Sequence, residues 1–271
     1  MTSTVSDKRE AFRRLHESGC FVLPNPWDVG SAVILQHLGF QALATTSAGM
    51  AWAMGRADGA VSLDEVLAHL SSLAQATDLP LNADFENGFA DAPADVARNV
   101  ARAVETGVAG LSVEDYPGGA ASGLYDFSLA VERIAAAREA IDKAGGGVVL
   151  TARSEGFIRG APNMDETLKR LDAYARAGAD CLYAPGLRQE EQVRTVVAAC
   201  APKPVNILAP GLSVETLARL GARRISIGGS LASVAYRAFY AAAQEIAEKG
   251  DFTTMLAPAR GVPLNPIFAG R

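Results

Sequence analysis

The chain has 271 residues, 49% of them hydrophobic and 20% charged, so it is long enough to bury a sizeable core without disulfides. Its 25 Lys and Arg residues against 30 Asp and Glu residues give a formal net charge of −5, which argues against a nucleic-acid-binding protein, because such a protein needs a clustered basic surface. No apolar run approaches the ~20 residues that span a bilayer, the first residues lack the apolar core of a signal peptide, and the three cysteines have no paired spacing. We therefore expect a soluble, cytoplasmic protein with neither a membrane nor a nucleic acid as its partner.

Short β-branched or apolar runs recur along the chain, and a longer segment with helical spacing follows each run. The runs are near-continuous rather than alternating, a pattern typical of parallel strands in a sheet that is covered on both faces. In chain order, the expected strands are residues 20–23, 42–46, 79–84, 110–114, 148–153, 180–184, 204–208 and 224–227. The clearest helical segments between them are residues 95–106, 128–144, 164–177, 189–199 and 214–220.

Glycines and a capping residue mark where several of these helices end or begin. Gly39, Gly107, Gly178 and Gly221 each stand shortly before an expected strand. A glycine in the left-handed conformation ends a helix at such a position and turns the chain back. Ser213, before the segment VETL, is suited to cap the start of a helix.

Strands that alternate with helices in this number, over ~250 residues, predict an α/β fold of the (β/α)8 or TIM barrel type. A doubly wound sheet is the competing arrangement, but the segment PNPWDVGSA after the first expected strand lacks the dinucleotide-binding loop GxGxxG. No linker or low-complexity segment divides the chain. We therefore expect one barrel domain over residues 1–271, with residues 251–271 as a C-terminal arm.

Polar side chains gather at the expected carboxyl ends of the strands, the face that carries the chemistry in barrel enzymes. They are Thr45, Thr46, Ser47, Asp58, Asn82, Asp84, Glu86, Glu114, Asp115, Arg153, Glu155, Asn206 and Ser226. Carboxylates on adjacent strands, without His or paired Cys, favour a hard divalent cation such as Mg²⁺, with Mn²⁺ as an alternative. The planar guanidinium of Arg153 suits a substrate carboxylate or phosphonate. The pattern predicts a pocket for a small anion that bears a carbonyl group, which the cation would polarise.

Each of these residues also has a structural interpretation when it is taken alone. Asp84 is equally suited to cap a helix or to join an ion pair. Glu114 and Asp115 are suited to face water in a loop, and Arg153 to pair with Glu114. Residues 228–230 (Gly-Gly-Ser) suit either a phosphate group or close packing of strand against helix. The histidines fall in expected helices away from the strand ends and are interpreted as structural or surface residues: His16, His37 and His69.

The polar residues lie in segments that resemble the isocitrate lyase/phosphoenolpyruvate mutase superfamily over nearly the whole barrel. The matching segments are FVLPNPWDVGSA, TTSAGMAWAMGRADG, PLNADFENGFAD, AGLSVEDYPGG, LTARSEGFIRG, PVNIL and ISIGGSLA. The most specific of them resemble the superfamily patterns D-A-D-x-G-y-G at the third strand, L-E-D at the fourth and A-R-x-E/D-a-F at the fifth. The resemblance is strong for the superfamily and much weaker for any one activity.

The resemblance implies a metal site built from carboxylates. Asp84 would be the principal metal ligand, and Asp58 and Glu114 would reach the ion through waters. Asn82 stands where many members carry an Asp, which lowers the negative charge near the ion. Glu86 stands near a position usually held by Gly or Thr and would restore a charge.

The resemblance also implies a substrate site and an assembly. Arg153 would bind the substrate carboxylate. The turn of Thr46, Ser47 and Ala48 would bind the 2-oxo acid end through backbone N–H groups, and Asn206 would contact the distal part of the substrate. Superfamily members are commonly homotetramers that exchange their last helices between subunits, so a homo-oligomer is expected.

The loop after the fourth strand departs most from the superfamily. Its sequence, YPGGAASGLYDF, lacks the acid/base Cys of the isocitrate and methylisocitrate lyases. It also lacks the Lys and the Asn or Thr of the mutase and of phosphonopyruvate hydrolase. The candidate proton donors in it are Tyr116, Ser122 and Tyr125, whose hydroxyl groups have high ordinary pKa values.

We therefore expect a Mg²⁺-dependent carbon–carbon lyase that cleaves or forms the bond next to a small 2-oxo or 2-hydroxy carboxylate through an enolate. Reactions like those of methylisocitrate lyase or oxaloacetate decarboxylase both fit. Decarboxylation depends least on a proton donor in the loop, because solvent can protonate an enolate. The expected catalytic residues are Arg153, Glu114, Tyr116 and Ser122. The alternatives are a barrel that binds oxo acids without turnover, a C–P bond enzyme of the phosphonopyruvate type, and a phosphate-binding aldolase or isomerase. The last of these lacks an obvious Schiff-base lysine at the end of a strand.

Overall fold

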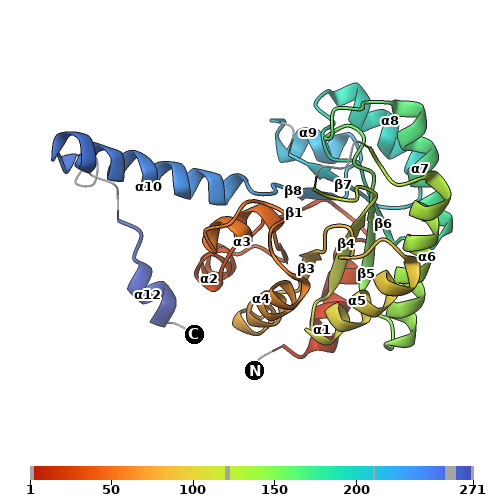
Figure 1. Cartoon of the computed structure of the whole chain (residues 1–271), viewed down its shortest axis with the longest axis horizontal. Coiled ribbons are helices and arrows are strands. Elements are labelled where there is room, and N and C mark those ends of the chain that lie inside the picture. Colours follow the sequence, from red (N-terminus) through yellow and green to blue (C-terminus); the bar gives the residue numbers. More distant parts are fainter. Residues whose placement is uncertain (1–2, 120–122, 210, 254–260, 270–271) are drawn as a thin grey trace.

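The computed structural model describes residues 3–119, 123–209, 211–253 and 261–269. Its centre is one sheet of eight parallel strands in the order β1-β8-β7-β6-β5-β4-β3-β2 (Figure 1). The strands are β1 (Phe21–Leu23), β2 (Leu43–Ala44), β3 (Leu81–Asp84), β4 (Gly110–Glu114), β5 (Val149–Arg153), β6 (Cys181–Tyr183), β7 (Val205–Leu208) and β8 (Arg224–Ser226). Each expected strand is present, shortened by at most three residues.

The sheet closes into a barrel between its two edge strands, β1 and β2. The Ala44 backbone N–H donates to the Pro24 carbonyl (3.0 Å), and the Asn25 side-chain amide donates to the Thr45 carbonyl (2.8 Å). These bonds join the edges without a regular ladder, so the barrel is nearly closed. The predicted (β/α)8 barrel is therefore confirmed.

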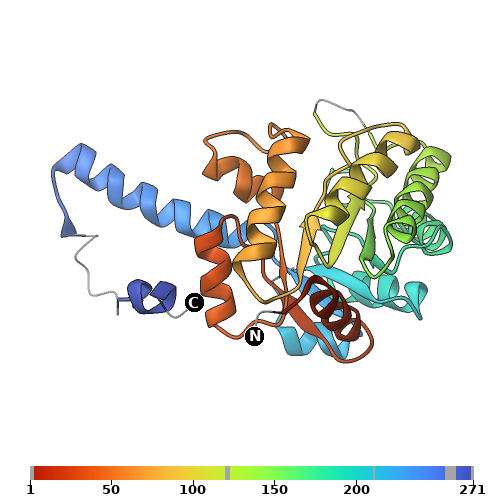
Figure 2. The same ribbon diagram turned by 90° about the horizontal axis from the view of Figure 1, so that it is seen from below.

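All helices except the last two in the chain surround the barrel on the outside (Figures 1 and 2). The helices are α1 (Val5–Leu15), α2 (Val29–His37), α3 (Ser47–Ala53), α4 (Leu63–Ala76), α5 (Pro93–Glu105), α6 (Phe127–Lys143), α7 (Met164–Arg176), α8 (Glu190–Cys200), α9 (Val214–Arg219), α10 (Ser230–Lys249) and α12 (Leu264–Ala269). The helix α1 precedes the first strand. Its Phe12 is fully buried among strand residues that include Phe21, Leu23 and Val149, so it fills the amino-terminal end of the barrel.

Local sequence signals set the ends of the helices as expected. The four predicted helix-ending glycines have positive φ angles: Gly39 (83°), Gly107 (89°), Gly178 (103°) and Gly221 (91°). A side chain is strained in this left-handed region, which is why glycine serves at these turns. The Ser213 side chain accepts a hydrogen bond from the Thr216 backbone and caps α9.

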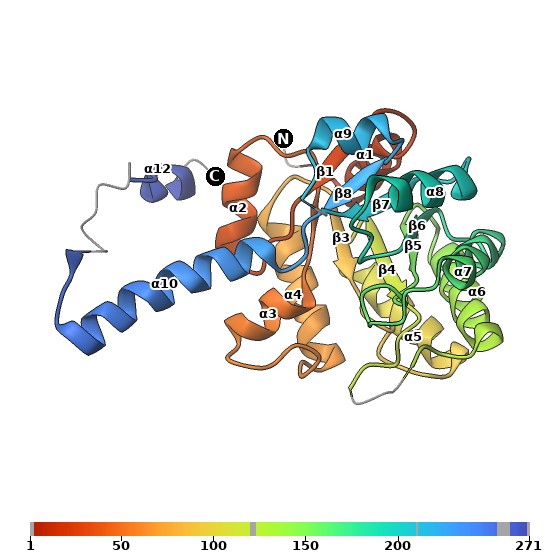
Figure 3. The same cartoon turned by 90° about the horizontal axis from the view of Figure 1, so that it is seen from above.

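The C-terminal part of the chain leaves the barrel. The 20-residue helix α10 projects away from it, and α12 lies back beside α2 (Figure 3). Three large side chains on α10 are mostly exposed: Val234 by 64%, Phe239 by 71% and Tyr240 by 67%. Of the predicted arm, residues 254–260 and 270–271 lie outside the described residues. No helix within the described ranges is long and apolar enough to cross a membrane.

Candidate functional site

A cavity of about 340 Å³ lies at the carboxyl ends of the strands, where the site is predicted. Its lining comprises Thr46, Ser47, Ala48, Asp58, Gly59, Asp84, Glu86, Glu114, Tyr116, Gly118, Gly119, Arg153, Ile158, Arg159, Tyr183, Leu208, Gly228 and Gly229. Two larger hollows of about 510 Å³ each lie beside α1, away from these strand ends. The fold therefore gathers most of the predicted site residues around one cavity.

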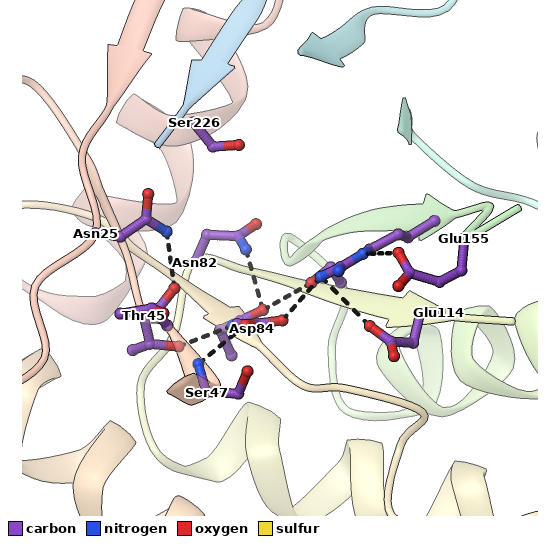
Figure 4. A network of polar contacts seen from close by, with 12 residues as sticks. Asn25, Thr45, Ser47, Asn82, Asp84, Glu114, Glu155 and Ser226 are labelled. Atoms are coloured by element: carbon purple, nitrogen blue, oxygen red, sulfur yellow. Dashed lines mark hydrogen bonds and ion pairs between the residues drawn. The ribbon is translucent and has the colours of Figure 1, made fainter. Parts of the chain in front are cut away.

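Arg153, the last residue of β5, is surrounded by carboxylates. Its Nη1 lies 3.4 Å from Asp84 Oδ1 and 3.3 Å from Glu114 Oε2, and its Nε donates to Glu155 Oε1. Figure 4 shows these carboxylates converging from neighbouring strands. Burial alone would lower the pKa of Arg153, but the negative charges around it, those of Glu114 and Glu155 foremost, raise that pKa above its ordinary value. The guanidinium is held charged and in place at the base of the cavity.

Asp84, the last residue of β3, is fixed from the side of β2. Its Oδ2 accepts a hydrogen bond from the Ser47 backbone N–H (3.0 Å), and its own backbone N–H donates to Thr45 Oγ1 (2.8 Å). Ser47 is the first residue of α3, and the Thr46 side chain caps this helix. Asp84 therefore joins an ion pair and also faces the start of a helix, where backbone N–H groups favour negative charge.

Two further carboxylates crowd the same cavity. Burial, followed by repulsion from Asp84 and Asp58, raises the pKa of Glu86 to about 7. Burial also raises the pKa of Glu114, in spite of the opposing charge of Arg153. Glu114 and Asp115 are 7% and 3% exposed, so the interpretation of both as water-facing loop carboxylates is wrong. Burial is the first cause of both shifts and neighbouring carboxylates add to them, so a cation bound in the cavity would favour the charged form of both side chains.

The oxygen donors of this cavity fit a hydrated Mg²⁺ ion. Neither His nor Cys is among its lining residues, and the carboxylates of Asp58, Asp84, Glu86 and Glu114 are hard ligands. Among the residues that the structure describes, no three His, Cys, Asp or Glu side chains are grouped closely enough to cage an ion. Mg²⁺ usually keeps several waters and takes one or two protein carboxylates, whereas Zn²⁺ needs three or four direct protein ligands. The hard carboxylate oxygens that line this cavity therefore suit Mg²⁺.

Asn82 and Asn206 lie deeper in the barrel than the other predicted site residues. They line a smaller cavity of about 50 Å³ that shares Asp84 and Arg153 with the larger one. Asn82 Oδ1 accepts from Arg224 Nη1 (3.3 Å) and Asn206 Oδ1 from Arg224 Nε (2.8 Å). The structure thus places both amides on a buried arginine beneath the site, and not on the wall of the larger cavity.

The loop after β4 contributes one of its candidate proton donors to the cavity. Tyr116 lines the cavity, and its hydroxyl donates to the Gly119 carbonyl (3.2 Å). Tyr125 is buried instead; its hydroxyl bonds to Asp91 and Asn87, so it anchors the base of the loop. Ser122 lies outside the described residues.

Sequence reasoning missed Arg159 and left Glu155 without a role. Arg159 lines the cavity, its Nε donates to Glu155 Oε2 (3.0 Å), and its guanidinium carbon lies 4.0 Å from the centre of the Tyr116 ring. The spacing of four residues between Glu155 and Arg159 was the available signal, since the turn over residues 155–159 brings them together. Asp115 proves structural: it accepts hydrogen bonds from the Glu155 backbone, Tyr174 and Arg170.

Comparisons with known proteins agree with this geometry. Residues 12–247 match the sequence model of the phosphoenolpyruvate phosphomutase family. The chain is 33% identical to an uncharacterized protein of Mycobacterium tuberculosis, over 86% of each chain. It is 30% identical to an oxaloacetate decarboxylase of Pseudomonas putida, over 86% of this chain and 83% of the relative.

Solved structures give the same picture. A protein of Burkholderia cenocepacia J2315, named provisionally as a lyase/mutase, superposes with a TM-score of 0.93 at 43% identity and covers 98% of this chain and 96% of its own. An oxaloacetate acetylhydrolase in complex with its product oxalate superposes with a TM-score of 0.86 at 26% identity, covering 98% of this chain and 94% of its own.

Proposed function

The chain belongs to the phosphoenolpyruvate mutase/isocitrate lyase superfamily, and from that premise we propose that it is a Mg²⁺-dependent carbon–carbon lyase acting on a small 2-oxo or 2-hydroxy carboxylate in the cytoplasm. The observation that carries the proposal is the cavity in which Arg153 meets Asp84 and Glu114 beside the start of α3. It pairs an anion-binding group with a carboxylate-rich cation site, as chelation of an oxo acid requires.

Each part of the cavity has a task in such a reaction. Arg153 binds the substrate carboxylate, because a planar guanidinium donates to two oxygens at once. The first turn of α3, with Ser47 and Ala48 in the cavity wall, stabilises negative charge that develops on the oxo oxygen. Asp84 would hold the ion directly, with Asp58, Glu86 and Glu114 around its waters. When bound, Mg²⁺ supplies Lewis-acid polarisation of the substrate carbonyl.

The loop after β4 decides which reaction fits best. Residues 116–125 contain no Cys, His or Lys, so they offer no group that titrates near neutral pH to protonate a departing carbanion. Decarboxylation of a 3-carboxylated 2-oxo acid needs no such group, because solvent can protonate the resulting enolate. We therefore favour an oxaloacetate-decarboxylase-like reaction over a methylisocitrate-lyase-like one. The similarity to an oxaloacetate decarboxylase is consistent with this choice.

The test is turnover of a small panel: oxaloacetate, methylisocitrate, isocitrate, phosphonopyruvate and 2-oxo acid aldols, each with Mg²⁺ and with chelator. We expect carbon–carbon cleavage of one member, loss of activity on chelation, and a fall of at least about 100-fold in kcat/KM for Asp84→Ala. Turnover that survives both exhaustive chelation and Asp84→Ala would exclude the mechanism.

A barrel that binds oxo acids without turnover is the second candidate, favoured by the missing proton donor on the loop and by Asn82 at the usual Asp position. Thermal-shift measurements separate the two. Stabilisation by an oxo acid without product after long incubation would support binding alone, whereas clear turnover would eliminate it.

We also propose that the chain acts as a homo-oligomer, a tetramer by the resemblance, in which α10 packs against a second copy. The support is the apolar face of α10, whose Phe239 and Tyr240 are more than half exposed in the single chain.

A further inference from the structure

We propose that Tyr183 is the proton donor of the reaction, and that its hydroxyl protonates the carbon of the enolate that carbon–carbon cleavage leaves in the cavity. Tyr183 is the last residue of β6 and lines the cavity at the carboxyl ends of the strands. The inference rests on the proposed function. It places the proton donor on the barrel itself, outside the loop after β4.

A chain of hydrogen bonds leads from the buried Arg224 to the Tyr183 hydroxyl. Arg224 Nε donates to Asn206 Oδ1 (2.8 Å), and Asn206 Nδ2 donates to Ser226 Oγ (2.9 Å). The Ser226 hydroxyl in turn forms a hydrogen bond to the Tyr183 oxygen. These side chains come from β8, β7 and β6, which pair in this order in the sheet. All four residues are at most 7% exposed, so water competes little for these bonds.

The direction of the bonds in this chain follows from Arg224. A guanidinium carries donors only, so the Asn206 oxygen faces it and the Asn206 nitrogen donates to Ser226. Ser226 accepts that bond and keeps its own proton for Tyr183. The Tyr183 hydroxyl therefore receives a hydrogen bond, and none of the hydrogen bonds between described residues uses its proton. This proton is available to a ligand in the cavity that Tyr183 lines.

Two positive charges favour the release of this proton. The guanidinium carbon of Arg153 lies 5.4 Å from the centre of the Tyr183 ring, and Arg224 begins the hydrogen-bond chain. Burial raises the pKa of Tyr183, but the charge of Arg153 and the hydrogen bond from Ser226 oppose that rise. A phenolate that forms for a moment in the cavity is therefore stabilised by groups that are already in place.

The proton transfer balances without a further reactant. Cleavage of the carbon–carbon bond leaves its electron pair in the enolate. The enolate carbon then takes the proton from Tyr183 Oη, so that a C–H bond forms, the O–H bond breaks and the carbonyl group is restored. Because the carbon of an enolate is a stronger base than a phenolate, the transfer is favourable. The phenolate recovers a proton from solvent as the product leaves.

Tyr116 is the second tyrosine among the lining residues, and its hydroxyl is placed differently. It donates to the Gly119 carbonyl (3.2 Å) within the loop after β4. Tyr183 instead lies on a barrel strand, between the pairing partners Arg153 and Asn206 on β5 and β7. A proton donor has to keep its position relative to the reacting carbon, and a strand holds a side chain more precisely than a loop does. The placement therefore favours Tyr183.

The experiment follows cleavage of oxaloacetate, or of the panel member that the protein cleaves instead, by the Mg²⁺-loaded wild-type protein and by Tyr183→Phe. Loss of substrate and appearance of the protonated product are recorded together, and a released enol is detected by its ultraviolet absorbance. We expect the wild-type protein to form the protonated product without a lag. Tyr183→Phe should form it at least about 100-fold more slowly or release the enol first, because a positioned proton donor contributes about 10²–10⁴-fold.

Calorimetry with oxalate, a planar analogue of the enolate, separates loss of the proton donor from loss of the site. Tyr183→Phe should bind oxalate within about threefold of the wild-type protein, since phenylalanine keeps the ring. Ser226→Ala removes the hydrogen bond to Tyr183 and should slow product formation by about tenfold. Tyr236→Phe is the matched control, because Tyr236 lies on α10, is 37% exposed and is not among the lining residues. It should change neither measurement.

Several results would overturn the inference while the proposed function stands. They are release of the enol by the wild-type protein, an unchanged rate without a lag in Tyr183→Phe, and an oxalate affinity that falls in step with the rate. Loss of protonation in Tyr116→Phe but not in Tyr183→Phe would assign the donor to the loop instead. If the wild-type protein cleaves no member of the panel, the proposed function fails first and the inference fails with it. Should Tyr183→Phe not fold, an unchanged rate in Ser226→Ala contradicts the chain.

Discussion

At the scale of single residues, a neutral histidine contacts the buried Arg224 beneath the site. His16 Nδ1 lies 2.7 Å from the Phe12 carbonyl, and its Nε2 lies 3.4 Å from Nη1 of the buried Arg224. The ring therefore donates through Nδ1 and presents the Nε2 lone pair to the guanidinium. Burial and the positive charge of Arg224 lower the pKa of His16 to about 3.

This contact predicts acid sensitivity. The folded-state pKa of His16 lies below its ordinary 6.5. As the pH falls below 6.5, His16 therefore takes up a proton in the unfolded chain but not in the folded one, and the free energy of unfolding decreases. The loss from this group amounts to about 2 kcal/mol at pH 5 relative to pH 7.5. Urea denaturation at both pH values checks it. Glutamine cannot take up the proton, so between pH 7.5 and pH 5 the free energy of unfolding of His16→Gln should fall by about 2 kcal/mol less than that of the wild-type protein. An equal fall in both proteins would contradict the neutral state assigned to His16.

At the scale of elements, the start of α3 sets the geometry of the cavity. Gly49 lies in the first turn of this helix, and a Cβ atom there would come within 2.7 Å of Thr46 Cγ2 and 2.9 Å of Trp27 Cβ. Real Cβ contacts are not this short, so the helix would have to shift. Because Ser47 in the same turn holds Asp84, such a shift would reach the site.

We expect Gly49→Ala to lower the free energy of unfolding by about 1–3 kcal/mol through overpacking, and to weaken Mg²⁺ binding as well. Thermal or urea denaturation and calorimetry with Mg²⁺ measure the two effects. Gly261→Ala is the control, since none of the described atoms lies within 4 Å of its Cβ position. Unchanged stability and Mg²⁺ binding in Gly49→Ala would show that α3 tolerates displacement.

At the scale of the whole molecule, the barrel and the C-terminal part of the chain differ in how they bury apolar surface. The barrel encloses its own core between the sheet and the surrounding helices. The helix α10 projects beyond it (Figure 3). Its Val234, Phe239 and Tyr240 side chains are uncovered in the single chain. Large apolar side chains that a helix leaves exposed outside the core are typical of a subunit interface.

We expect Phe239→Glu to shift the protein from an oligomer to a smaller species, because a charge buried at an interface is costly. Light scattering coupled to size-exclusion chromatography measures the mass. Gln244→Glu, which places the same charge at an exposed polar position of α10, should leave the mass unchanged. A wild-type monomer would rule out the proposed assembly.

The fold was predictable from the sequence because its signals are local. Near-continuous apolar runs marked the strands within three residues, and glycines such as Gly107 and Gly178 marked helix ends through their backbone freedom. The acidic and basic residues that follow the strands were predictable as a group, since the carboxyl ends of barrel strands meet at one face.

Local sequence patterns were therefore enough to predict the barrel, the face that carries the site, and the superfamily that its motifs resemble. Which polar groups contact one another depends on the three-dimensional fold. The register of β4 and β5 sets Glu114 opposite Arg153, the barrel interior turns Asn82 toward Arg224, and the loop after β5 lays Arg159 over Tyr116. These contacts depend on strand register and loop path between residues far apart in the chain, which no local pattern encodes.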